Sequence, residues 1–196
     1  MFDAVSHFPI VFLHIPGRSP IFLRPSESHD LFGAGFMLIG SLMTAEALAG
    51  GVWRRSWIRT AIFPITLILM GVGMVAVTVF EPQARLAHFA MGTPLAIGGW
   101  TEAKVRFEGM NRRYADGFII AGLLFAALEI SQYHLNGPPS NGVYITHASL
   151  IVSAIVIAGL RFYHGRAPAS LARSLLVSGA VIAVGIQLFV DGAFQP

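Results

Sequence analysis

Long apolar stretches separated by short polar turns constrain this chain most, because few folds accommodate them. Six such stretches follow one another along the sequence, at residues 31–51, 61–80, 86–101, 117–134, 143–163 and 171–190. A helix needs about 20 mostly apolar residues to cross the hydrocarbon core of a bilayer. Charged residues make up 12% of the chain, whereas an average soluble domain has about 25%. We therefore predict an all-α fold, a polytopic transmembrane helical bundle of about six spans.

The spans do not occupy the whole chain. Four prolines interrupt residues 1–30, which we interpret as an extramembrane or interfacial N-terminal arm, and residues 31–196 then form the six-helix transmembrane domain. The third stretch is short and contains Pro94, which predicts a kink, or a re-entrant segment and five spans as the alternative. Each odd-numbered span has a histidine followed ten to twelve residues later by a glycine, which suggests three helical hairpins.

The basic residues indicate the orientation. Cytoplasmic loops of membrane proteins carry an excess of lysine and arginine. By the predicted topology one side has only Arg18, Arg24 and Arg85. The opposite side has ten basic residues, Arg54, Arg55, Arg59, Lys104, Arg106, Arg112, Arg113, Arg161, Arg166 and Arg173. We therefore expect the N-terminus and the C-terminus both on the outer side of a multi-pass protein of the inner (plasma) membrane.

Four histidines fall in the outer leaflet of this topology, His29, His88, His134 and His147. At 1.5 Å per residue, His88 and His147 lie about 5 Å below the outer ends of their helices. An ionisable group inside a membrane span is costly and is a functional-site hypothesis by default. Imidazole ligates haem iron, copper or zinc, and it also relays protons.

These histidines suggest two kinds of cofactor site. In the first, His88 and His147 are the axial ligands of a b-type haem, and Arg85, one turn from His88, meets a propionate. In the second, His88, His147, His29 and His134 bind copper or zinc, with Glu129 as an oxygen ligand or a hydrogen-bonding partner of a ligand. The chain has no cysteine, so thiolate sites are excluded. A chain without any cofactor is the third alternative.

The histidine pattern resembles that of membrane b-type cytochromes and of copper-resistance-type membrane proteins. The resemblance is carried by fragments such as His88-Phe-Ala-Met-Gly and Gly98-Gly-Trp100, and no family is identified from them. It would imply a haem or copper ligated by histidine.

The leading hypothesis is an integral membrane subunit that binds haem b or a metal through the outer-leaflet histidines and takes part in electron transfer. Its electrons would come from a membrane quinone or a periplasmic redox protein, because no loop is long enough for a soluble catalytic domain. One alternative is a cofactor-free structural or assembly subunit, surrounded by lipid and by partner subunits or copies of itself. The other is a small proton-coupled transporter that uses Glu129. Positive-inside topology accounts for the basic residues without nucleic acid, and no catalytic residue or enzyme class is assigned.

Overall fold

The computed structural model describes residues 25–80, 85–135, 141–164 and 170–193, and these residues are almost entirely helical. The helices are α1 (Pro25–Ala49), α2 (Gly51–Arg54), α3 (Trp57–Phe80), α4 (Arg85–Glu108), α5 (Arg112–Leu135), α6 (Asn141–His164) and α7 (Leu171–Gly192). Residues 1–24 of the expected N-terminal arm lie outside the described residues. The all-helical prediction is confirmed.

Five helices are long and apolar enough to cross a membrane, namely the segments His29–Ala49, Trp57–Val77, Arg112–Ser131, Ile145–Tyr163 and Leu171–Asp191. The chain is therefore a multi-pass membrane protein by the length and composition of its helices.

Helix α4 corresponds to the predicted third span and is the one long helix in the described residues that does not pass this test. It runs without interruption through Pro94. It also continues to Glu108, so Glu102, Lys104 and Arg106, which follow the apolar stretch 86–101, belong to its last two turns. With these charges included, α4 is the least apolar of the long helices.

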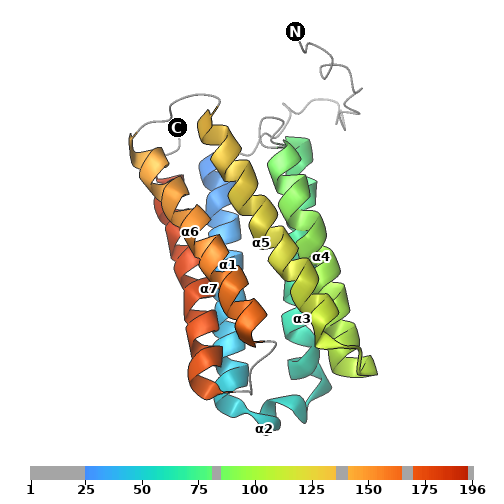
Figure 1. The fold of residues 1–196 in the computed structure, drawn as a ribbon. Helices are drawn as coiled ribbons and strands as arrows, with labels where there is room; N and C mark the ends of the chain where they lie inside the picture. The colour runs from blue at the N-terminus through green and yellow to red at the C-terminus, as the bar shows by residue number, and fades with distance from the viewer. Residues whose placement is uncertain (1–24, 81–84, 136–140, 165–169, 194–196) are drawn as a thin grey trace.

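The six long helices form a closed ring in the order α1, α3, α4, α5, α6, α7 (Figure 1). The most extensive contacts are those of α1 with α7 and of α3 with α4, whereas α1 and α3 touch only slightly. In the described part of the chain, the backbones of helices that are not neighbours in the ring do not approach each other, and such helices meet through side chains. We divide the ring into two halves of three helices, one of α1, α6 and α7 and the other of α3, α4 and α5, which meet at the slight α1–α3 contact and at the more extensive α5–α6 contact.

Small residues account for the closest pairs of helices. A Cβ added to Gly71 of α3 would lie 2.4 Å from the backbone nitrogen of Ala96 and 2.5 Å from the carbonyl oxygen of Gly92, both on α4. In the same way, a Cβ on Gly33 of α1 would lie 2.8 Å from the carbonyl oxygen of Gly185 on α7. In lipid, such close approach of backbones is a main source of helix association, because the bilayer is as apolar as the helix surface.

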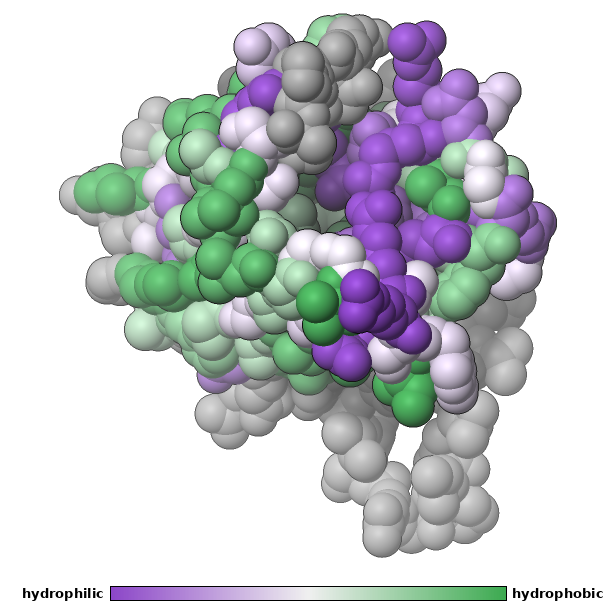
Figure 2. Space-filling view, turned by 90° about the horizontal axis from the view of Figure 1, so that it is seen from below, coloured by the Kyte–Doolittle hydropathy of each residue, from purple (hydrophilic) through white to green (hydrophobic). Residues whose placement is uncertain are grey.

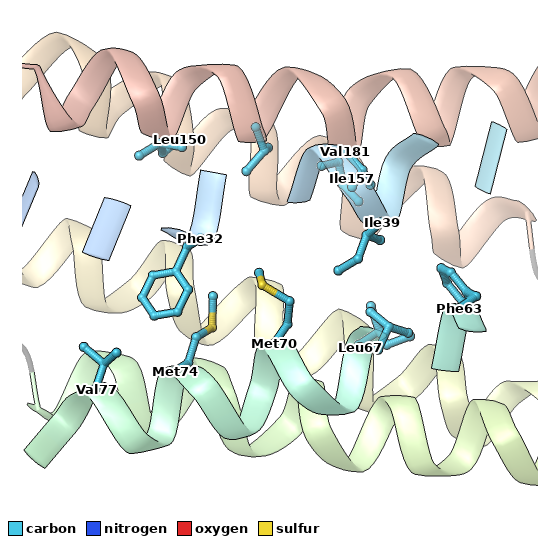
Figure 3. Close-up of a cluster of buried hydrophobic side chains, with 12 residues drawn as sticks. Phe32, Ile39, Phe63, Leu67, Met70, Met74, Val77, Leu150, Ile157 and Val181 are labelled. Atoms are coloured by element: carbon cyan, nitrogen blue, oxygen red, sulfur yellow. The ribbon is translucent and has the colours of Figure 1, made fainter. Parts of the chain in front are cut away.

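Apolar side chains fill the middle of the ring. The side chains of α3 and α1 face each other there, with Met70 and Met74 opposite Phe32 and with Ile39 nearby (Figure 3). The two ends of the ring are polar instead. We call them the histidine end, where α1, α4 and α6 begin, and the arginine end, where α3, α5 and α7 begin.

Candidate functional site

A buried carboxylate organises the arginine end. Glu102 of α4 is fully buried, and its Oε1 accepts hydrogen bonds of 2.7 Å from both Arg106 Nε and Arg112 Nη2. A third guanidinium, that of Arg161 on α6, lies 3.8 Å from Glu102 Oε2. Glu102 Oε2 has no hydrogen-bond donor among the described residues. Three cations thus surround one carboxylate that still lacks a donor on one oxygen.

Two further ion pairs connect the halves of the bundle across this end. Arg106 Nη2 of α4 donates to Glu46 Oε2 of α1 at 2.7 Å, and Arg161 Nε of α6 donates to Asp116 Oδ1 of α5 at 2.9 Å. Charged groups buried in this way are paired because an isolated charge is very costly to remove from water. We call Glu46, Glu102, Arg106, Arg112, Asp116 and Arg161 the arginine-end network.

A cavity of about 510 Å³ enters the ring beside this network. Gly50, Gly51 and Leu171, which lie at the helix ends, belong to its wall, so it reaches the surface of the arginine end. Figure 2 views this end directly and shows hydrophilic side chains gathered along one side and apolar side chains opposite. Ligand pockets of proteins commonly have volumes of about 300–1,000 Å³, so the cavity is large enough for a small solute.

A second polar cluster lies at the histidine end, within the half formed by α1, α6 and α7. Asp191 of α7 is fully buried, and His29 Nδ1 lies 2.8 Å from its Oδ2. His147 Nε2 lies 3.2 Å from the same oxygen, and Thr146 of α6 donates its hydroxyl to Asp191 Oδ1. Because imidazoles from two helices meet one carboxylate, the cluster can take up a proton and share it among three groups.

His88 faces this cluster from the other half of the bundle. It is buried near the start of α4, and its ring packs against Phe32 of α1 with the ring centroids 5.5 Å apart. Three of the four histidines that the sequence placed at one depth therefore lie at the same end of the bundle.

The remaining predicted site residues, Glu129, His134 and Arg85, lie on α4 and α5. The backbones of α4 and α6, which carry His88 and His147, do not approach each other, and their described side chains meet at the opposite end of the bundle, through Arg161 and Glu102. Glu129 is half-buried on α5 and forms no hydrogen bond or ion pair with the described residues of the cluster. His134 lies near the end of α5 and Arg85 at the start of α4, and the side chains of both are outside the described residues.

The imidazoles of the cluster already face a carboxylate. In the described part of the chain, no group of three or more histidine, aspartate or glutamate side chains is arranged to hold a metal ion. His29 and His147 direct their nitrogens at one oxygen of Asp191, and such an arrangement suits hydrogen bonding and proton sharing.

Sequence reasoning missed Asp191 and the organisation of the arginine-end network. Asp191 directly follows the last apolar stretch, residues 171–190, and is not among the predicted site residues. The alternation of the spans places it at the depth of His29 and His147, so the depth argument would have found it. The ion pairs between distant helices left no such signal, because spacing along one helix does not reveal its neighbours across the ring.

Comparisons with known proteins add no family to this geometry: no family model, no curated protein and no solved structure matches the chain.

Proposed function

We propose that this protein is a proton-coupled transporter of a small polar solute. The observation that carries the proposal is the cavity at the arginine end, which enters a closed ring of helices beside buried charged side chains. Charged groups inside membrane bundles commonly mark the path of a substrate or an ion. The apolar middle of the ring closes the path on the side away from the cavity.

The two halves of the ring give the proposal a mechanism. Transporters alternate access by moving one bundle of helices against the other around a central site. Here the ion pairs Glu46–Arg106 and Arg161–Asp116 cross between the halves. Separation of the halves at the arginine end breaks these pairs and widens the cavity, whereas their formation closes that end.

Two helices connect the polar clusters at opposite ends. Helix α1 carries His29 at one end and Glu46 at the other, and α6 carries His147 and Arg161. A proton that binds between His29 or His147 and Asp191 changes how α1, α6 and α7 are held together. Since a helix moves as a stiff unit, that change is transmitted to the arginine-end network, which supplies the coupling between proton and solute.

The proposal includes six spans, with α4 as the sixth, because α4 lies beside α3 and α5 along the bundle (Figure 1). Positive-inside topology assigns the arginine end to the cytoplasm and both termini to the outer side of the inner membrane.

The test is a flux measurement. Purified protein is reconstituted in liposomes that contain a pH-sensitive dye, and small polar solutes are added on one side. We expect solute-dependent proton movement that is lost in Asp191→Asn and retained in Asp30→Asn, a matched change at an exposed residue of α1. The proposal would be contradicted if none of the solutes of the panel produced proton movement with the wild-type protein.

A haem- or metal-binding subunit in electron transfer is the second candidate, because His29, His88 and His147 lie at one end of the bundle. Its cofactor would be haem b, copper or zinc. Spectra of the oxidised and dithionite-reduced protein and elemental analysis test it: a Soret band or a stoichiometric metal supports it, and a colourless, metal-free protein refutes it. A protein with neither flux nor cofactor would leave the structural or assembly subunit as the remaining hypothesis.

A further inference from the structure

We propose that the cavity at the arginine end binds a small carboxylate that also carries a hydroxyl or ammonium group, with Arg112 bound to its carboxylate and Glu102 to its donor group. This proposal names the substrate class of the transporter and rests on the function proposed above.

The first step is the unused donor capacity of Arg112. A guanidinium has five N–H donors, and Arg112 gives one hydrogen bond to the described residues, that from Nη2 to Glu102. Its side chain is 40% exposed and lines the cavity. Arg106 differs, since it is 9% exposed and bonds to Glu102, Glu46 and the Thr60 carbonyl oxygen. Of Arg106 and Arg112, it is therefore Arg112 that has N–H groups available to bind a solute in the cavity.

The second step is the sign of the exposed charge. The three carboxylates of the wall are 0%, 12% and 16% exposed (Glu102, Asp116 and Glu46), whereas Arg112 is 40% and Arg54 71% exposed. The accessible charge of the wall is thus positive although the buried charges are nearly balanced. Guanidinium groups bind carboxylates through two parallel hydrogen bonds, which gives this part of the site its preference for an organic acid.

The third step is the oxygen of Glu102 that lacks a donor. Glu102 is fully buried, borders the cavity, and its Oε2 accepts no hydrogen bond from the described residues. A buried acceptor without a donor lowers stability, because it has lost its bonds to water and gained none in the protein. A solute O–H or N–H group supplies that donor, so the wall discriminates in favour of hydroxy acids and amino acids over simple acids. Met43, Phe63 and Val177 give the same cavity an apolar wall for a short carbon chain.

Binding to the purified full-length protein in detergent tests this with four probes. Glycolate has an acid and a hydroxyl group, glycine an acid and an ammonium group, acetate the acid alone, and ethanolamine the donor groups alone. We expect glycolate or glycine to bind about tenfold more tightly than acetate or ethanolamine, which corresponds to the loss of one hydrogen bond to a charged group. Equal binding of glycolate, glycine and acetate, or no binding of glycolate and glycine, would overturn the proposal without any substitution.

The variants locate the site. Arg112→Gln should weaken the binding of the preferred probe about tenfold or more, whereas Arg113→Gln, at the exposed next residue outside the cavity wall, should leave it unchanged. Equal effects of the two changes would contradict the assignment. These measurements need no gradient, so a failure of binding leaves proton-coupled transport to its own flux test. Binding without flux would reject transport and keep the site.

Discussion

Neutralising Glu102 tests how far the arginine-end network holds the bundle together. In Glu102→Gln the amide oxygen can still accept from Arg106 and Arg112, and the guanidinium donors keep their charge, but both bonds of 2.7 Å lose the negative charge of the acceptor. A hydrogen bond that involves a charged group contributes about 1.5–3 kcal/mol. A bond between opposite charges lies near the upper end of this range and a bond from a guanidinium to a neutral amide near the lower end, so the two bonds together lose about 2 kcal/mol.

Arg161 adds a smaller cost, because it loses an opposite charge 3.8 Å away. The total stays below the 3–5 kcal/mol typical of breaking a buried ion pair. Arg106 keeps Glu46, Arg161 keeps Asp116, and Arg112 is partly hydrated. We expect Glu102→Gln to lower the free energy of unfolding by about 2–3 kcal/mol.

The assay is unfolding by sodium dodecyl sulfate in mixed micelles, followed by the fluorescence of Trp53, Trp57 and Trp100. Glu108→Gln is the matched control on the same helix. It removes the Lys104–Glu108 pair, in which Glu108 is 62% exposed, and should cost at most about 0.5 kcal/mol. Equal destabilisation by the two changes would show that Glu102, although buried and bonded to arginines, contributes no more to the free energy of unfolding than an exposed glutamate.

Two further predictions concern helix packing and orientation. Gly71→Ala should lower the free energy of unfolding by about 1–3 kcal/mol in the same assay, because its Cβ would meet the backbone of α4. Gly73→Ala is the control and should not lower it, because the space around Gly73 is open. Equal stability of both variants would contradict the close α3–α4 contact. Because the chain has no cysteine, single cysteines report sidedness: an impermeant maleimide added to intact cells should label Asp30→Cys and not Arg55→Cys, and the reverse pattern would invert the topology.

The sequence predicted where the helices lie along the chain, but it did not predict which helices pack against one another. Depth follows from the alternation of spans, so His29, His88 and His147 were correctly expected at one end. Lateral position depends on which helix faces pack together. Glycine contacts join α1 to α7 and α3 to α4, but the sequence of one helix does not show which other helix will pack against its glycines. The apolar stretch 86–101 also ends before helix α4 does, because Glu102 and Arg106 are satisfied by charged partners and so remain inside the bundle.

Stability alone does not explain why these charges are buried. Replacing a buried ion pair by apolar side chains of similar volume is often neutral or stabilising, because the cost of removing two charges from water offsets their attraction. A bundle that needed only to be stable could therefore have leucines in place of the pairs Glu46–Arg106 and Asp116–Arg161. Ion pairs differ from leucines in one respect: they can exchange partners with water, a proton or a solute at modest cost. Their position between the two halves, beside a cavity, suits contacts that must break and re-form as the protein works.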